Sequence, residues 1–300
     1  MRRLSAAAAI PVLLYALSAC GHSNSEDRAS LPTAASSAGT QAPSASASPA
    51  LPSAPAAEAA SSAPAASASS EESAEPSSAA DNGVPLYRMN ANYDIVPIDK
   101  DKTERKVVLL TFDDGPKDST TLAPILDTLD KHHAKAIFFV NGYRVKKHPE
   151  LLQEIFDRGQ TIGNHSWDHI QLGKESADTI RKQLSDVQDI VKATVGSPPV
   201  FFRPPHGSGN ADTHAIAKEL GLLYMTWSDG SLDWEMSGDK IKDKTAAITR
   251  NITDQLHAGS NILMHELSWT AEALDSVLTT LEDKGYSFVD PGLIDVSDQP

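Results

Sequence analysis

The sequence predicts an α/β fold whose parallel strands curl into an incomplete or distorted β/α barrel. Two observations favour it. From about residue 106 onward, apolar runs that look like strands alternate with segments of helical spacing, and most of these runs are continuously apolar. Continuous apolar strands are typical of a parallel sheet that is buried on both faces. Periodicity does not establish closure of the sheet, so an open doubly wound sheet is the alternative.

Seven apolar runs are candidates for the strands. They are residues 107–112, 136–140, 161–163, 200–202, 222–227, 261–264 and 286–289. Between them, apolar stripes predict helices over 122–129, 180–191 and 274–281, and further helices are expected at 149–156, 211–220 and 241–256. Most of these segments are followed by a glycine, as expected of helix C-terminal caps: Gly159, Gly196, Gly221, Gly259 and Gly285.

The first twenty residues have the features of an export signal. A basic start at residues 2–3 precedes an apolar run at 6–16, which is too short to span a bilayer comfortably. The tetrad at 17–20 resembles a bacterial lipoprotein processing box, so we expect Cys20 to carry a lipid anchor in the cell envelope, with the chain facing the periplasm or the cell exterior. The alternative is an ordinary secretory signal with an incidental cysteine. Because Cys20 is the only cysteine, no intrachain disulfide or downstream thiolate metal site is possible.

Composition divides the rest of the chain into a linker and a domain. Residues 21–82 are dominated by Ala, Ser and Pro and should form a disordered tether. Residues 83–105 are expected to be an irregular N-terminal extension of the domain, and residues 106–300 the domain itself, which we expect to be monomeric. The net charge of −14 makes nucleic acid a poor partner, whereas a neutral or cationic polymer is compatible with it.

Polar residues cluster directly after the candidate strands. Asp113 and Asp114 end the first strand, residues 165–169 follow the third, residues 203–207 follow the fourth, and His265 ends the sixth. A further acidic and aromatic group, residues 229–234, follows the fifth strand. In a β/α barrel the carboxyl ends of the strands form one face, which is where active sites are built. The sequence therefore predicts that these residues converge on one site.

Two histidines in this set predict a metal site. His165 and His169 are four residues apart, a spacing that places both imidazoles on one side of a helical turn. Together with a carboxylate from Asp113 or Asp114 they would form a set of two histidines and one acid. Such a set suits a hydrolytic Zn²⁺ with a position open to water, or a non-haem Fe²⁺.

Hydrolysis at such a site also needs a base for the attacking water, a donor to the developing oxyanion and an acid for the leaving group. The second aspartate of the pair is a candidate base, which Arg203 could keep ionised. His265 is a candidate acid, because Asp233 could raise its pKa. Taken singly, Arg203 could be a structural ion pair, residues 233–234 a loop anchor and His265 a hydrogen-bonded residue at a strand end.

These segments resemble the five ordered motifs of a known family. They are Thr-Phe-Asp-Asp-Gly-Pro at 111–116, His-Ser-x-x-His at 165–169, Arg-Pro-Pro-x-Gly at 203–207, Asp-Trp at 233–234 and Leu-Met-His at 263–265. Together they look like the carbohydrate esterase family 4 polysaccharide deacetylases, the NodB-homology group, over about residues 106–291. The resemblance implies a deformed (β/α)₇ barrel that uses a divalent metal to remove N-acetyl groups from polymeric amino sugars, or occasionally O-acetyl groups from xylan.

The resemblance also implies which of Asp113 and Asp114 is the base and which binds the metal, a choice that the residues alone left open. It implies that Asp113 is the general base and that Asp114, His165 and His169 bind the metal. Arg203 would orient Asp113.

Four further positions complete the implied site. Asp233 would tune the pKa of His265, the implied general acid, while Trp234 and Leu263 would line the pocket for the acetyl methyl group. The backbone N–H near His206 would help to hold the oxyanion. The family usually has an aromatic residue such as Tyr where this chain has His206, which affects the shape of the pocket and the substrate preference.

The sequence thus predicts a metal-dependent N-deacetylase that acts on a cell-envelope glycan such as peptidoglycan or another N-acetylglucosamine polymer. Zn²⁺ is the first choice of metal, with Co²⁺ or Ni²⁺ as alternatives. Three other functions are weighed against this one: an acetylxylan-type O-deacetylase, a catalytically silent glycan-binding lipoprotein, and an Fe²⁺ oxygenase with the same ligand set.

Overall fold

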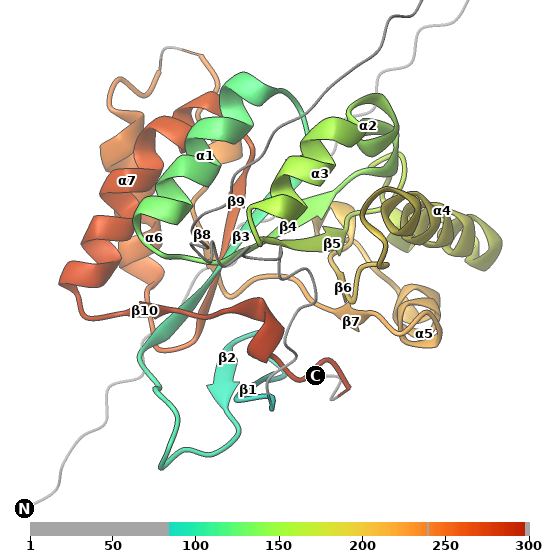
Figure 1. Ribbon diagram of the computed structural model, residues 1–300, viewed down its shortest axis with the longest axis horizontal. Helices are drawn as coiled ribbons and strands as arrows, with labels where there is room; N and C mark the ends of the chain where they lie inside the picture. Colours follow the sequence, from blue (N-terminus) through green and yellow to red (C-terminus); the bar gives the residue numbers. More distant parts are fainter. Residues whose placement is uncertain (1–83, 239, 298–300) are drawn as a thin grey trace, which may run out of the picture. The chain divides into compact units, whose positions relative to one another are not determined.

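A computed structural model describes residues 84–238 and 240–297 (Figure 1). The expected signal peptide at 1–20 with Cys20, and the expected linker at 21–82, lie outside the described residues. Within the described part of the chain, no helix combines the length and the apolar character that crossing a membrane requires.

A parallel eight-stranded sheet forms the centre of the fold. Its hydrogen-bonded order is β7-β6-β5-β4-β3-β9-β8, and β10 pairs with the first residues of β3. The strands are β3 (Val107–Gly115), β4 (Ala136–Val140), β5 (Thr161–Asn164), β6 (Phe201–Phe202), β7 (Leu223–Tyr224), β8 (Asp229–Gly230), β9 (Ser260–His265) and β10 (Ser287–Phe288).

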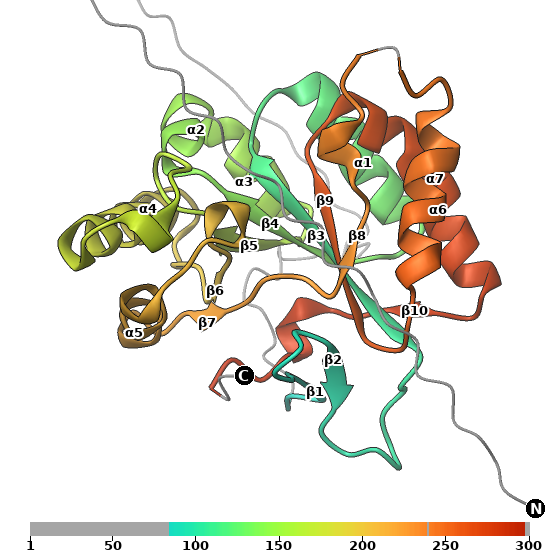
Figure 2. The ribbon, with the colours of Figure 1, turned by 180° about the vertical axis from the view of Figure 1, so that it is seen from behind.

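The two edges of this sheet are neighbours in the sequence, which requires the sheet to curl. β7 ends at Tyr224 and β8 begins at Asp229, so the connecting backbone spans at most roughly 17 Å. Within the described residues β7 and β8 are not paired with each other, so the barrel stays open along this seam. The expected deformed β/α barrel is therefore confirmed (Figures 1 and 2).

Helices cover the outer face of the sheet: α6 and α7 lie beside α1 at the left of Figure 1 and the right of Figure 2, and α4 and α5 lie at the opposite side. The helices are α1 (Ser119–Lys131), α2 (Gly142–Lys147), α3 (Pro149–Asp157), α4 (Ala177–Val195), α5 (Ala211–Glu219), α6 (Lys244–Gln255) and α7 (Ser268–Asp283). Short 3₁₀ turns lie at η1 (Leu172–Lys174), η2 (Pro205–Gly207), η3 (Asp233–Glu235) and η4 (Pro291–Leu293). The apolar stripes predicted for α1, α4 and α7 are buried, as expected.

The alternation of side chains along β3 decides which residues face the barrel interior. Val108, Leu110 and Phe112 belong to the outer core that packs against the helices, whereas Val107 and Leu109 belong to the interior core. Side chains two apart on a strand point the same way. The interior row therefore continues through residues 111 and 113, and the strand delivers Asp113 to the mouth of the barrel.

Some predicted boundaries were wrong. The expected strand at 222–227 is reduced to β7, and the unpredicted β8 pairs with β9 through Asp229 and Gly230. The extension before residue 106 is not irregular, because β1 (Tyr87–Met89) and β2 (Ile95–Pro97) form an antiparallel pair that packs on the interior core. The helix α2 was also missed, since its short sequence carries one buried apolar residue, Val145.

Asp229 is an acid that is completely buried beside β9. Its exposed fraction is 0%, and neither carboxylate oxygen has a well-aligned hydrogen-bond donor among the described residues. Burial raises the pKa of Asp229 to about 7, although Ser260 and His257 act in the opposite direction. Because the folded pKa lies above the unfolded value, the folded state binds this proton more tightly. The corresponding stability is present at low pH and lost as pH rises through about 7.

We therefore expect Asp229→Asn to be more stable than the wild type at pH 8, by about 1–3 kcal/mol, and to gain much less at pH 5. The amide cannot ionise, so the cost of a buried charge at high pH disappears. Urea unfolding at both pH values measures the difference. The raised pKa of His257 gives a slope of the same sign, so the two proteins must be compared with each other at each pH. An equal gain at pH 5 and pH 8 would contradict this account.

Candidate functional site

A bulge at the end of β3 turns two consecutive carboxylates toward one site. The pairing of β3 with β4 shifts register between Asp113 and Gly115, and Asp114 has a φ of 68°. A bulge of this kind re-aims a side chain that would otherwise point to the opposite face. As a result, Asp113 Oδ2 and Asp114 Oδ1 each lie 3.6 Å from Nε2 of His165.

The segment after β5 brings the two histidines together without a helical turn. Ser166 and His169 have positive φ values of 65° and 58°, so the expected helical geometry was wrong. Side chains fix this loop instead: Asn164 accepts a hydrogen bond from the Ser166 amide, and the Ser166 hydroxyl accepts one from the His169 amide. The rings of His165 and His169 still lie close, with centroids 5.1 Å apart.

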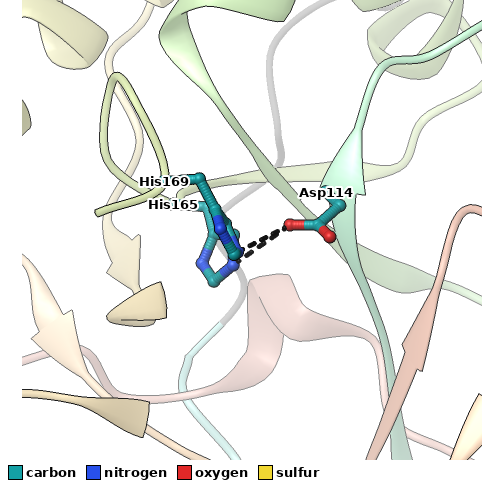
Figure 3. A group of neighbouring side chains, drawn as sticks. All are labelled: Asp114, His165 and His169. Carbon is teal, nitrogen blue, oxygen red and sulfur yellow. Dashed lines mark ion pairs between the residues drawn. The ribbon is translucent and has the colours of Figure 1, made fainter. Parts of the chain in front are cut away.

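Asp114, His165 and His169 form a candidate metal site (Figure 3). One potential ligand atom from each lies within 4.8 Å of the other two, and Asp114 Oδ1 is 3.0 Å from His169 Nε2. Figure 3 shows the carboxylate directed at both imidazoles. Although Asp114 Oδ1 is buried, it accepts no well-aligned hydrogen bond in the described structure. A buried oxygen facing two imidazole nitrogens fits a divalent cation, for which carboxylate and imidazole are ordinary ligands.

The protonation states of these residues agree with metal binding. Burial by itself would raise the pKa of Asp114, but His169 and His165 lower it well below its usual range, so the carboxylate is ionised. Burial lowers the pKa of His165, which favours the neutral ring that binds metals. The Nδ1–H of His165 donates to the backbone carbonyl of Arg203 at 2.7 Å. Since a carbonyl only accepts, Nε2 is left with its lone pair toward the site.

The guanidinium of Arg203 is fully buried and connects several strands. Its Nη1 donates to Asp113 Oδ1 at 2.7 Å and to Thr111 Oγ1 at 2.8 Å. Its Nε and Nη2 donate to the carbonyl of Thr226, on the link between β7 and β8, and Nη2 also reaches Asn261 Oδ1 on β9. Arg203 therefore holds Asp113 Oδ1 in place and leaves Oδ2 facing the candidate metal site.

On the other side of the site, Asp233 holds His265 in one orientation. Asp233 Oδ1 lies 2.8 Å from Nδ1 of His265, and Oδ2 accepts from the His265 amide and from the Thr270 hydroxyl, both at 2.7 Å. Burial alone would lower the pKa of His265. The hydrogen bond and charge of Asp233, with smaller contributions from Asp113 and Asp114, instead raise that pKa above its ordinary value. His265 can thus keep a proton near neutral pH.

The candidate ligands, Asp113 and His265 all line one cavity of about 560 Å³, whereas Arg203 and Asp233 lie behind its lining. It is lined by Asp113, Asp114, His165, His169, His206, Trp227, Trp234, Ser237, Leu263, His265, Leu267 and Trp269. His206, Trp234 and Leu263 thus lie at the pocket, as the resemblance implied. A second cavity of about 540 Å³ opens at the other ends of β5 and β6, where its lining is mainly apolar and carries none of the predicted site residues.

Several residues of the site were missed from the sequence. Trp227 and Trp269 line the cavity, and Thr111, Asn261 and Thr270 hold Arg203 or Asp233. The detectable signal was a polar residue inside an otherwise apolar strand, as at positions 111 and 261. A buried polar side chain must find a hydrogen-bond partner, so such positions indicate a network.

Comparison with known proteins gives a consistent result. The family profile described as polysaccharide deacetylase matches residues 100–225. The chain is 37% identical over 193 residues to peptidoglycan-N-acetylglucosamine deacetylase PgdA of Listeria monocytogenes, covering 64% of this chain but only 39% of that relative. It is 34% identical over 210 residues to peptidoglycan-N-acetylmuramic acid deacetylase PdaA of Bacillus subtilis, covering 69% of this chain and 78% of that relative.

Among solved structures, a carbohydrate esterase family 4 pseudoenzyme from Bacillus anthracis is similar, with a TM-score of 0.58 and 31% identity over 62% of this chain and 63% of that one. The fold, the ordered motifs and the extent of the match to PdaA lead to one conclusion. The chain belongs to the polysaccharide deacetylase family.

Proposed function

We propose that the protein is a metal-dependent hydrolase that removes N-acetyl groups from a glycan of the cell envelope. Peptidoglycan is the first candidate, and another N-acetylglucosamine polymer is the second. The observation that carries this proposal is the convergence of Asp114, His165 and His169 beside an arginine-held Asp113 and an aspartate-held His265. Zn²⁺ is the proposed metal, with Co²⁺ or Ni²⁺ as functional substitutes.

On one side of the cavity, Asp113 takes a proton from the attacking water. Arg203 occupies Oδ1 of Asp113, so Oδ2 is the oxygen that receives the proton. A cation held by Asp114, His165 and His169 would supply Lewis acidity to the acetyl carbonyl and to the water. The oxygen of the water then bonds to the acetyl carbon, with charge developing on the former carbonyl oxygen.

On the opposite side, His265 completes the reaction. The carbon–nitrogen bond breaks, acetate leaves, and the sugar nitrogen takes a proton from Nε2 of His265. The bond between Nδ1 of His265 and Asp233 leaves Nε2 free to face the cavity. Trp234 packs edge-on against His265, with ring centroids 5.4 Å apart, and together with Leu263 offers an apolar surface for the acetyl methyl group.

The relatives support peptidoglycan as the proposed substrate, since PgdA and PdaA are both named as peptidoglycan deacetylases. The similar pseudoenzyme favours a second candidate function, a glycan-binding protein without turnover. The described site of this chain has a residue suited to each proposed role of acid, base and metal ligand, which supports turnover. We also propose that Cys20 is lipidated and that the chain is anchored in the cell envelope beside its substrate.

We expect the Zn²⁺- or Co²⁺-loaded protein to release acetate from N-acetylated glycans, and the metal-stripped protein to release none until metal is returned. Peptidoglycan, chitin oligomers and acetylxylan, assayed in parallel, distinguish N- from O-deacetylation. Asp113→Asn keeps the shape of the base but cannot accept the proton, so kcat should fall roughly 10²- to 10⁴-fold. A metal-loaded wild type that binds these glycans but releases no acetate would support the silent binding function instead.

The acid role of His265 gives a pH dependence with a defined sign. His265 must be protonated, and Asp233 raises its pKa, so activity should fall as pH rises through that folded pKa. In Asp233→Asn the negative charge is lost, and the amide can donate to Nδ1. The alkaline limb of kcat should then move to lower pH. A pH profile of acetate release measures this shift, and an unchanged alkaline limb would rule out His265 as the acid.

The proposed anchor is tested by Cys20→Ser. We expect the wild type to sediment with membranes and to incorporate labelled fatty acid, and the variant to do neither, because serine lacks the thiol to which the lipid would be attached. Ser18→Ala, which keeps a small residue before the cysteine, is the matched control and should behave as the wild type. If Cys20→Ser remained labelled and membrane-bound, the anchor would lie elsewhere.

A further inference from the structure

Glu266 is a buried acid beside the site that does not line the cavity. It follows His265 directly, and its exposed fraction is 1%. It is absent from the lining of the catalytic cavity, so it does not meet the substrate there. Burial of an acid is costly unless the acid makes specific contacts. The contacts of Glu266 therefore indicate why the acid is there.

Those contacts tie the end of β9 to the loop that leaves β3. The backbone amide of Glu266 donates to the carbonyl of Asp113 at 3.2 Å, which extends the pairing of the two strands past His265. The side chain then reaches the far side of the loop, where Oε1 accepts from the amide of Lys117 at 2.7 Å. Asp114, the carboxylate ligand, lies between these two attachment points. Glu266 thus contacts the chain on both sides of the bulge that orients Asp114.

The same carboxylate lies close to the backbone at Gly115. A Cβ at that position would lie 2.5 Å from Glu266 Oε2, closer than real contacts allow. The carboxylate is therefore packed against the backbone of the residue that follows Asp114. Gly115 has no positive φ, so the constraint that a side chain would meet here is the Glu266 carboxylate, which would have to move away from the loop to make room for it.

We propose that Glu266 is a positioning residue that sets Asp113 and Asp114 in register with His265 by pinning the loop between β3 and α1 to the end of β9. By positioning Asp114, Glu266 would strengthen metal binding. By positioning Asp113, it would keep the proposed base in the orientation that catalysis needs. The part that concerns catalysis depends on the proposed deacetylase function, whereas the part that concerns metal binding does not.

The chemistry of Glu266 indicates which variants separate a positioning role from general stability. Burial raises the pKa of Glu266 to about 7, and Oε2 has no hydrogen-bond partner among the described residues. The backbone amides of Lys117 and Asp118 both interact with the carboxylate, and both need only an acceptor, so Glu266→Gln can retain the contact with Lys117. Glu266→Ala removes it, and Glu266→Asp is too short to keep it.

A matched control lies at the other end of the sheet. Gln160 is also buried, and its Oε1 accepts from the backbone amide of Ala136 at 2.8 Å. Gln160→Ala therefore removes a buried contact between a side chain and a backbone amide that is remote from the metal site.

The experiment measures Co²⁺ affinity from the absorbance of the bound ion, together with kcat and KM for acetate release, in full-length protein. We expect Glu266→Ala to weaken Co²⁺ binding roughly 10- to 100-fold. We also expect it to lower kcat roughly 10- to 100-fold with KM within about twofold. Glu266→Gln should stay within about threefold of the wild type, and Gln160→Ala should lower Tm without changing Co²⁺ affinity.

If Glu266→Ala does not fold, Glu266→Asp takes its place and should show the same weakening relative to Glu266→Gln. The proposal is overturned if the affinity of the Ala or Asp variant for Co²⁺ equals that of the wild type, if Gln is no better than Ala or Asp, or if Gln160→Ala weakens the metal site equally. Because Co²⁺ binding needs no turnover, a wild type without deacetylase activity would refute the proposed function while leaving this test intact.

Discussion

The buried guanidinium of Arg203 is the interaction on which the site depends. Burying a charge costs several kcal/mol unless it is paired and hydrogen-bonded, and Arg203 is paired with Asp113 and bonded to Thr111, Thr226 and Asn261. Its partners lie on β3, on β9 and on the link between β7 and β8, where the strands themselves do not pair. The carbonyl of Arg203 also orients His165. One residue therefore holds the proposed base, one proposed metal ligand and the open seam of the barrel together.

The two histidines on opposite sides of the cavity have pKa values that are shifted in opposite directions. Burial lowers the pKa of His165 and favours a neutral ring, whereas Asp233 raises the pKa of His265 and favours a charged one. The orienting groups explain the contrast, since a neutral carbonyl accepts from His165 and an ionised carboxylate accepts from His265. Two imidazoles in one cavity are thereby suited to different tasks, metal binding and proton donation. Strongly perturbed pKa values within one cavity are typical of a functional site.

The sequence predicted the features that depend on local pattern. Continuous apolar runs indicated parallel strands, and polar residues after them indicated a site at the carboxyl ends, where Asp113 and His265 do lie. It missed features that depend on distant partners. The two-residue β8 has no apolar run and exists because β9 pairs with it, and Glu266 bonds to a backbone amide 149 positions away. The loop at 165–169 was assigned a helical turn because residue spacing cannot reveal that Ser166 and His169 adopt positive φ.

Family membership alone does not decide turnover, because a similar structure is described as a pseudoenzyme. The position that departs from the family resemblance, His206, is therefore informative. Its ring packs edge-on against His169, with centroids 4.7 Å apart, so it takes the place of an aromatic ring at the rim of the cavity. Partial desolvation, with the nearby His169, lowers the pKa of His206. A neutral ring would not repel a bound cation as an imidazolium would, so this departure is compatible with the proposed metal site, and it changes the polarity of the surface that would meet a glycan.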